Sequence, residues 1–227
     1  MDYQPTTAYT QPPVFEQILV VVLFIVIEAL HSVFVTSAAA VLDSAIMWAL
    51  VGVSYGLVLL MIYDYLLLTC NDPVDDLVLK IERNYHPSQL KQCDEGCRCQ
   101  VHVRSYHCKR CKRCVEYFDH HCKYLNNCIG GKNYYPFLRM LMAVTAYCLS
   151  LMGESVWLFL KSYQDETFNQ GILSRWGILS TFLLSLVALL AVDSLLCFHF
   201  YLIFCLKSTT YDYIMNQPDS TQSDQPH

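Results

Sequence analysis

A cluster of cysteines near the middle of this 227-residue chain is the part of the sequence best equipped for chemistry. Eight of the twelve cysteines lie between Cys93 and Cys128, interspersed with histidines. Structural zinc is bound by four Cys or His ligands, often in C-x2-C pairs whose tight turn directs two sulfurs at one ion. Cys108, Cys111 and Cys114 show this spacing twice. The stretch predicts two closed zinc sites with at least one thiol in excess, and metal would supply much of its folding free energy.

The surplus thiol stands in a reactive context. Cys122 directly follows Asp119, His120 and His121. A cysteine becomes a nucleophile when a base stabilises its thiolate, and histidine is the usual base. A carboxylate can orient that imidazole, while the second histidine serves as a zinc ligand. The alternative is a purely structural cysteine, and the spacing alone does not choose between the two.

The elements that must position these residues are membrane helices. Hydrophobic residues make up 54% of the chain and charged residues only 15%, which excludes a disordered chain and disfavours an ordinary soluble one. A spanning helix needs about 20 largely apolar residues. Four segments qualify and leave almost no polar face with which to cover soluble helices. They are Ile18–Leu42, Ala45–Thr69, Phe137–Leu160 and a stretch within Gly177–Leu206.

The basic residues predict the orientation of these spans. Twelve of the fifteen Lys and Arg residues lie between Lys80 and Arg139, which places that loop in the cytosol by the positive-inside tendency. A cytosolic loop is reducing, so metal binding or catalysis is favoured over a disulfide-stapled module. The net charge of −5 does not suggest nucleic-acid binding. The first residues, 1–17, contain no Lys or Arg and so are not expected to be a cleaved signal. We expect spans at 18–42, 45–69, 137–160 and 177–206. The arm (1–17), the domain (70–136) and the tail (207–227) would be cytosolic, and the loop (161–176) luminal.

Polar residues inside the expected spans are costly in hydrocarbon and usually face a cavity or a partner. Glu28 and His31 are three residues apart and could pair on one helical face. Packing contacts that hold the bundle together are at least as good an explanation for this class as a functional role. The full set is Glu28, His31, Asp64, Glu154, Asp193 and His199.

The sequence Asp119–Cys122, inside a cysteine-rich loop between membrane spans, resembles the DHHC family of protein S-acyltransferases, or palmitoyltransferases. The resemblance runs from about Asn71 to Asp212 and includes the four-span layout. Asn71-Asp72-Pro73 is similar to the family's DPG motif with Val74 for glycine, and Thr209–Asp212 to its TTxE motif with Asp for Glu. The matching residues of the loop are Arg104, His107, Cys108, Cys111, Cys114, Asp119, His120, His121, Cys122, Asn126–Gly130, Asn133, Tyr134 and Phe137.

This resemblance implies a role for each residue of the motif. Cys122 would be the acyl-accepting nucleophile, His120 its base and Asp119 the orienting carboxylate. The fold implied is an all-α integral membrane protein with four transmembrane helices and a zinc-binding domain between the second and third. One of two Zn²⁺ ions would be held by Cys108, Cys111, His121 and Cys128, the other by Cys97, His107, Cys114 and one further thiol.

The fourth ligand of that second set is where the chain departs from the family. The family's C-x2-C spacing would require a cysteine at Asp94, and the sequence offers Cys93 or Cys99 instead. Either reaches the metal only with a reshaped turn. Cys93 is favoured, because the x1 spacing of Cys99 from Cys97 would crowd two sulfurs on nearly adjacent residues.

The activity implied is ping-pong transfer of a fatty acyl group, palmitoyl above all, from acyl-CoA to membrane-proximal cysteines of protein substrates. Arg104 and the basic run Lys109–Arg113 could meet the CoA phosphates, although solvation and topology signalling explain the same charges. The family implies a Golgi or endoplasmic reticulum membrane, with the plasma membrane as an alternative. Because only a short polar tail follows Asp212, recruitment could rest on the loop, an accessory subunit or self-association.

Three other classes of protein compete with this interpretation. A membrane-anchored zinc interaction module of the ubiquitin-ligase kind leaves Cys122 and the Asp119–His120 pair unexplained. A catalytically weak or inactive scaffold related to the acyltransferases is disfavoured by the intact quartet, although Val74 and Asp212 depart from the family. A transporter would use the intramembrane acids, but repeats and broken helices are not detectable.

Overall fold

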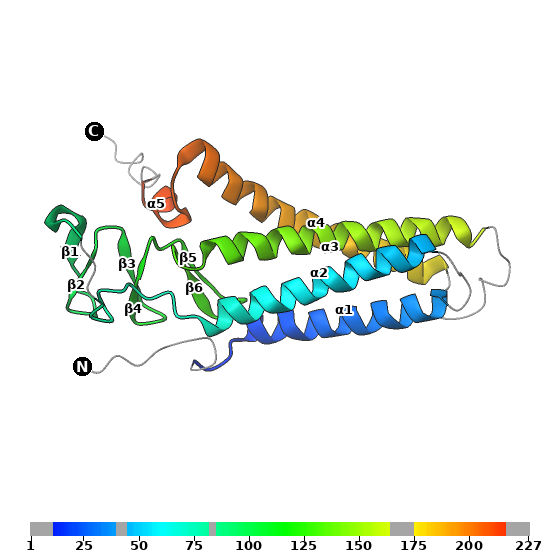
Figure 1. Ribbon diagram of the computed structural model, residues 1–227, viewed down its shortest axis with the longest axis horizontal. Helices are drawn as coiled ribbons and strands as arrows, with labels where there is room; N and C mark the ends of the chain where they lie inside the picture. Colours follow the sequence, from blue (N-terminus) through cyan, green and yellow to red (C-terminus); the bar gives the residue numbers. More distant parts are fainter. Residues whose placement is uncertain (1–10, 40–44, 82–84, 164–174, 217–227) are drawn as a thin grey trace, which may run out of the picture.

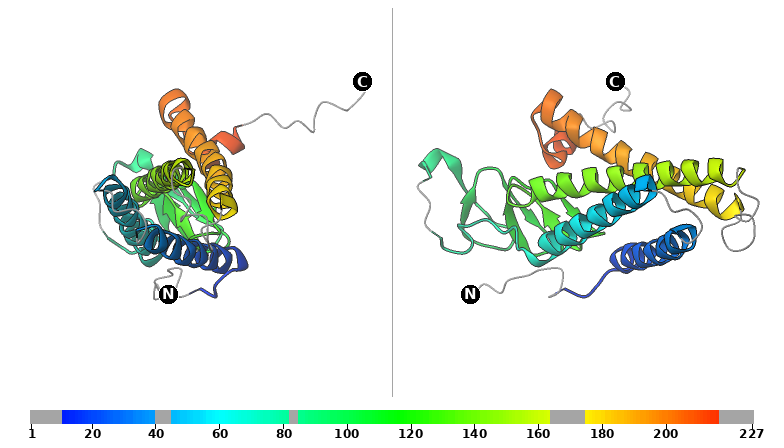
Figure 2. Two further views of the ribbon diagram at one scale, coloured as in Figure 1. Left: turned by 90° about the vertical axis from the view of Figure 1, so that its right-hand side faces the viewer. Right: turned by 45° about the vertical axis from the view of Figure 1, so that its right-hand side comes forward.

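The computed structural model describes residues 11–39, 45–81, 85–163 and 175–216. Its long helices run roughly side by side, and short β-hairpins gather at one end of them (Figure 1). α3 packs extensively against both α2 and α4, whereas α1 packs more loosely and chiefly on α2 (Figure 2). The long helices of the described residues are α1 (Phe15–Ala39), α2 (Ala45–Cys70), α3 (Tyr134–Lys161) and α4 (Arg175–Tyr201).

Three segments of the described residues are long and apolar enough to cross a membrane: Trp48–Cys70, Tyr134–Lys161 and Arg175–Leu206. They fall where the second, third and fourth spans were expected, so a mostly helical chain with membrane-spanning capacity is confirmed at those three places. The first expected span overlaps α1. Its last residues, the link at 43–44, and parts of the arm, of the 161–176 loop and of the tail lie outside the described residues.

The cysteine-rich region consists mainly of short strands and turns with one 3-10 turn, and here the all-α expectation was wrong. It folds into three separate two-stranded antiparallel sheets, which pair β1 with β2, β3 with β4 and β5 with β6. Strands of three or four residues are too short to give a readable alternation of apolar and polar residues. The elements are η1 (Pro87–Gln89), β1 (Leu90–Gln92), β2 (Gln100–His102), β3 (Ser105–Cys108), β4 (Arg113–Glu116), β5 (His120–Cys122) and β6 (Asn127–Ile129).

The last hairpin is joined rigidly to the start of α3. The buried Asn133 precedes the helix, donates from its side-chain amide to the carbonyl of Cys128 at 2.9 Å and accepts from the N–H of Gly130 at 2.9 Å. A side chain at Gly130 would come within 2.5 Å of Val115, so a glycine is required there for the two hairpins to touch. The helix bundle and the hairpins therefore meet through a fixed joint.

The chain after α4 turns back towards the hairpins (Figure 1). A π-helical turn (Leu202–Leu206) ends at Lys207, whose φ of 50° is left-handed and reverses the chain. The Thr209 hydroxyl then accepts a hydrogen bond from the N–H of Asp212 and caps α5 (Thr210–Met215). On α5, Tyr211 packs against Tyr106 with ring centroids 4.1 Å apart, which docks the segment on the second hairpin.

A buried arginine ties the end of α2 to the hairpins. Arg113 is 2% exposed and its guanidinium lies 3.1 Å from the carboxylate of Asp72. It also donates to the side-chain carbonyl of Asn127 at 2.8 Å, and the amide of Asn127 donates to the carbonyls of Leu68 and Asn71. Because a buried charge is tolerated only when it is paired, this network fixes how the hairpins sit on the bundle.

We expect Asp72→Ala to destabilise the chain by about 3 kcal/mol, because it leaves the buried guanidinium of Arg113 without its carboxylate partner. The thermal unfolding midpoint in detergent should fall accordingly. Glu95→Ala removes an exposed carboxylate from the first hairpin and should leave the midpoint unchanged. Equal midpoints for the two variants would contradict a stabilising role for the pair.

Polar groups inside the bundle pair between helices rather than within one. The predicted Glu28–His31 pair is replaced by two others: His31 lies 2.9 Å from the carboxylate of Glu154, and Glu28 accepts a hydrogen bond from the hydroxyl of Tyr147. Ser54 donates to the second oxygen of Glu154 at 2.5 Å. The acids further along are paired in the same way, Asp64 with Arg139 and Asp193 with Thr145.

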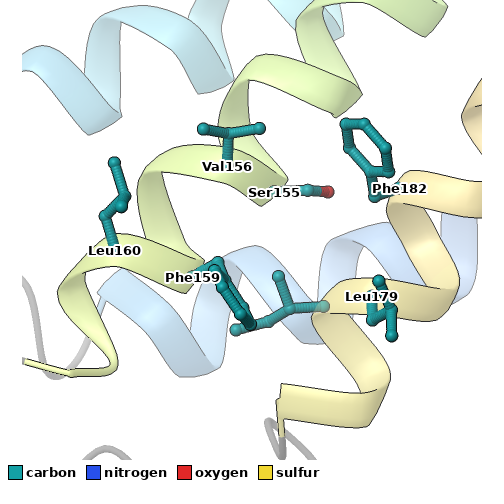
Figure 3. Close-up of a pocket in the computed structure, with 7 residues that line it drawn as sticks. Ser155, Val156, Phe159, Leu160, Leu179 and Phe182 are labelled. Carbon is teal, nitrogen blue, oxygen red and sulfur yellow. The ribbon is translucent and has the colours of Figure 1, made fainter.

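An open apolar hollow of about 200 Å³ lies between α3 and α4 at the end of the bundle away from the hairpins (Figure 3). Its walls come from the last turns of α3 and the first turns of α4, so it is separate from the cysteine-rich region. It is lined by Ser155, Val156, Phe159, Leu160, Ile178, Leu179 and Phe182.

Candidate active site and metal centres

The first two hairpins bring four ligand atoms together. Those of Cys93, Cys97, His107 and Cys114 all lie within 4.8 Å of one another. Nδ1 of His107 is 3.5 Å from the sulfur of Cys97 and 3.7 Å from that of Cys114, and the sulfurs of Cys93 and Cys114 are 3.2 Å apart. Cys99 is not among these four. The donor set and spacing fit one closed tetrahedral zinc site.

The loop between Cys93 and Cys99 shows how the unusual spacing is accommodated. The N–H of Cys93 donates to the carbonyl of Cys99 at 3.0 Å, so the β1–β2 ladder continues past its strands and closes a wide loop. Arg98 inside it is left-handed, with φ 49°. Gly96 is needed for packing, because a Cβ there would lie 2.7 Å from Cε1 of His107. This reshaped turn carries Cys93 to the cluster and leaves Cys99 outside.

A second cluster joins the second and third hairpins. It contains Cys108, Cys111, His121 and Cys128, whose ligand atoms also lie within 4.8 Å of one another. Nδ1 of His121 is 3.2 Å from the sulfur of Cys111 and 3.7 Å from that of Cys128. The sulfurs of Cys111 and Cys128 are 3.3 Å apart. This is again a Cys3His donor set of the kind that holds structural zinc.

Hydrogen bonds within each cluster favour a charged thiolate. The hydrogen bond with Cys114, together with one from His107, lowers the pKa of Cys97 to about 5, although burial of Cys97 opposes this shift. Bonds from Cys111 and Cys128 lower the pKa of Cys108 in the same way. Since the thiolate is the form that coordinates a metal, both clusters have the chemistry as well as the geometry for zinc.

The third hairpin carries residues of two different sites, the candidate metal ligand His121 and the pair of His120 and Cys122. Successive side chains of a strand point to opposite faces, so His120 and Cys122 share one face of β5 and His121 takes the other. His121 reaches the second cluster, and Asp119 precedes the strand with its N–H bonded to the carbonyl of Ile129 at 2.8 Å. One strand of three residues thus serves both sites.

Asp119, His120 and Cys122 form a linked group. Nδ1 of His120 lies 2.7 Å from one carboxylate oxygen of Asp119, which is 2% exposed. The other oxygen accepts the backbone N–H of Thr210 at 2.8 Å, so the segment after α4 helps to orient the carboxylate. Burial lowers the pKa of His120, but hydrogen bonds with Asp119 and with the Cys122 thiol outweigh it and raise the pKa to about 9. The group is therefore set up to move a proton from Cys122 to His120.

The Cys122 side chain is 8% exposed and lies at the junction of helices and hairpins. Apolar side chains from α2, α3, α4 and the third hairpin surround it, which excludes much of the water that would otherwise compete for a reactive thiolate. The members of this cluster are Leu68, Leu125, Ile129, Phe137, Leu138, Leu141 and Leu196.

A second histidine joins this group, and the sequence did not assign it there. His199 of α4 is 1% exposed, and its ligand atom lies within 4.8 Å of those of Asp119 and His120. Its Nδ1 is 2.9 Å from the hydroxyl oxygen of Tyr134, and its ring meets Phe137 edge-on at 5.1 Å. The position of His199 in the last turns of the fourth span, at the end nearest the hairpins, is the sequence feature that could have predicted this contact.

Arg104, expected to contact CoA, has other neighbours in the described structure. Its guanidinium lies over the ring of Tyr117 at 5.7 Å, and its N–H donates to His102 at 3.2 Å. The contacts found in the described part of the chain do not join it to the group around Cys122. A role for Arg104 in binding CoA stays a prediction.

Comparisons with known proteins match the cysteine-rich region and much of the chain that follows it. The family model for the DHHC palmitoyltransferase matches residues 86–217. The chain is 30% identical over 137 residues to probable protein S-acyltransferase 6 of Arabidopsis thaliana, covering 60% of this chain and 33% of that one. It is 33% identical over 128 residues to palmitoyltransferase erf2 of Schizosaccharomyces pombe, covering 54% and 36%. With palmitoyltransferase pfa3 of Emericella nidulans it shares 38% identity over 78 residues, covering 34% and 15%. The matched part therefore spans about a third or less of each of these relatives.

Proposed function

Because the chain belongs to the DHHC palmitoyltransferase family, we propose that it transfers fatty acyl groups, palmitoyl above all, from acyl-CoA to cysteine thiols of proteins. The observation that carries this proposal is the linked group of Asp119, His120 and Cys122 in an apolar junction at the end of the helix bundle. A buried thiol beside an oriented imidazole suits attack on a thioester, and the apolar neighbours suit a fatty chain.

The first half of the proposed reaction loads Cys122. Its thiol proton passes to His120, and the thiolate attacks the carbonyl carbon of the acyl-CoA thioester. The bond between that carbon and the CoA sulfur breaks, and the departing CoA thiolate takes the proton back from His120. Asp119 holds the ring throughout and stabilises its charged form.

The second half unloads Cys122 by the same chemistry in reverse order. His120 takes the proton of a substrate cysteine, whose thiolate attacks the acyl carbon on Cys122. The thioester to Cys122 breaks, the new thioester forms on the substrate, and Cys122 recovers the proton. Each half exchanges one thioester for another, so no external energy source is needed.

We propose that four helices span an endomembrane of the Golgi or endoplasmic reticulum, with α1 as the first span. Under this arrangement the hairpins and both ends of the chain face the cytosol, and the 161–176 segment faces the lumen. Twelve basic residues between Lys80 and Arg139 support that orientation. Substrates would then be proteins with cysteines near the membrane surface, since Cys122 lies where the hairpins meet the helices. An accessory subunit or self-association could assist recruitment.

Two zinc ions are proposed to have a structural role. Cys93, Cys97, His107 and Cys114 would hold one ion, and Cys108, Cys111, His121 and Cys128 the other. When bound, each ion crosslinks two neighbouring hairpins. Since four protein ligands close each site, neither ion has an open position for substrate.

Incubation of the purified full chain with fatty acyl-CoAs of graded length tests the proposal. We expect a hydroxylamine-sensitive acyl-enzyme, followed by transfer of the chain to a cysteine-containing peptide presented on detergent or lipid. A catalytically inactive scaffold or a zinc interaction module would give neither product. Failure of labelling at every chain length, with two zinc ions bound per chain, would overturn the proposed function.

Asp119→Asn should slow acyl-enzyme formation by about a hundredfold or more, because asparagine cannot stabilise the charged ring of His120. The measurement is the single-turnover rate of hydroxylamine-sensitive labelling. Asp94→Asn changes an exposed carboxylate of the first hairpin and serves as the matched control. A wild-type rate in Asp119→Asn, with zinc content unchanged, would contradict the role given to this carboxylate.

A further inference from the structure

A third group of metal-ligating side chains lies beside the reactive thiol. Asp119, His120 and His199 each offer one ligand atom, and the three atoms lie within 4.8 Å of one another. Asp119 is 2% exposed and His199 1% exposed. In a tetrahedral site with metal–ligand distances of about 2.0 Å, neighbouring donors stand about 3.3 Å apart. Small side-chain rotations would close the group to that spacing.

The donor set of this group differs from that of the two cysteine clusters. Two imidazoles and a carboxylate are ligands that suit Zn²⁺ and related borderline cations, and three protein ligands leave the fourth position open. Cys122, which lies on the same face of β5 as His120, is not one of the three residues of this group. Such a site binds a metal less tightly than a Cys3His cluster and exchanges it more readily.

His199 has the outer partner that a metal-ligating histidine usually has. The hydroxyl oxygen of Tyr134 lies 2.9 Å from Nδ1 of His199, which leaves Nε2 as the free nitrogen of the ring. Oxygen atoms bonded to the second nitrogen fix the orientation of histidine ligands in many metal sites. Asp119 is held likewise, by the backbone N–H of Thr210. Two of the three donors are thus positioned in advance by neighbouring groups.

We propose that Asp119, His120 and His199 form a third metal site, which binds Zn²⁺ reversibly and keeps the enzyme inactive while the ion is bound. The inactivation rests on the function proposed above. If the ion binds Nε2 of His120, it occupies the lone pair that would accept the proton of Cys122. If it binds Nδ1, the ring proton moves to Nε2, which again cannot accept one. Coordination through either nitrogen therefore removes the base.

The direct test measures binding and needs no activity. The full chain, purified in detergent with an affinity tag that lacks histidine and already holding two zinc ions, is titrated with Zn²⁺ by calorimetry. We expect one further equivalent in the wild type. His199→Gln should weaken this event more than about tenfold, and Tyr134→Phe by about tenfold. His86→Gln, which changes an exposed histidine that precedes η1, should leave this binding event unchanged.

Retention of two zinc ions by His199→Gln shows that this variant is folded. Absence of a third equivalent in the wild type, or equal affinity in His199→Gln, would mean an adventitious ion only and would overturn the site.

In the second arm, buffered free Zn²⁺ should suppress acyl-enzyme formation, with an inhibition constant that rises in His199→Gln by the same factor as the binding constant. Binding without inhibition would overturn the regulatory half. A chain that binds the third ion but never acylates would instead refute the proposed function.

Discussion

Cys122→Ser is expected to reduce hydroxylamine-sensitive labelling by acyl-CoA to background. Serine fills nearly the same space at the apolar junction, but its hydroxyl is not ionised beside His120 as a thiol can be. Any slow ester formed on the serine oxygen resists neutral hydroxylamine, so the assay separates the two products. Transfer to a peptide thiol should be lost together with labelling, since both halves of the proposed reaction pass through Cys122.

Exposed cysteines elsewhere in the chain make the control necessary. Cys70, Cys197 and Cys205 are exposed and could accept acyl groups without catalysis. Cys197 lies on α4, and its side chain is not part of the cluster around Cys122. The variant Cys197→Ser should therefore retain wild-type labelling. Thioester labelling that persists in Cys122→Ser at the wild-type rate would refute the assignment of the nucleophile.

Cys93→Ser is expected to lower the zinc content from two ions per chain to one, while Cys99→Ser keeps both. The sulfur of Cys93 lies 3.2 Å from that of Cys114, inside the four-ligand cluster, whereas Cys99 lies outside it. Structural zinc sites contribute on the order of 10 kcal/mol of folding free energy, so the first hairpins should lose their structure in Cys93→Ser. Elemental analysis gives the zinc content, and hydrogen exchange of residues 90–116 reports the folding.

The two cysteines make a matched pair, because they flank the same loop and both lie close to Cys97. Removal of zinc from the wild type by a strong chelator should reproduce the hydrogen-exchange pattern of Cys93→Ser and extend it to residues 119–129. Loss of an ion in Cys99→Ser with retention in Cys93→Ser would reverse the assignment of the fourth ligand. Two ions in both variants would show that the site does not depend on either thiol.

The sequence was most informative where ligands are close together in the chain. The C-x2-C spacings of Cys108, Cys111 and Cys114 predicted metal clusters, and the structure brings these residues into two such groups. The hairpins that carry them could not be predicted, because strands of three residues are defined by the ligands and the turns between them. Spacing favoured Cys93 over Cys99, and Cys93 is the one in the cluster, but the backbone bond to Cys99 that shapes the turn could not be read from the spacing.

Contacts between helices were the part that sequence patterns could not supply. The spacing of Glu28 and His31 suggested a pair on one helix, but each finds a better partner on α3, in Tyr147 and Glu154. His199 was visible as a polar residue in an apolar segment. Its approach to His120 depends on how α4 is rotated and tilted against the third hairpin, which is a property of the packed bundle.

The shared strand β5 has a consequence for how the protein matures. His121 points to one metal cluster and its neighbours His120 and Cys122 to the opposite face, so ligation and reactivity are set by the same register. A chain that has not yet received its metal holds that register only through the short β5–β6 ladder, without the link from His121 to the second hairpin. Metal loading and the alignment of His120 with Cys122 are therefore expected to arise together as the protein matures.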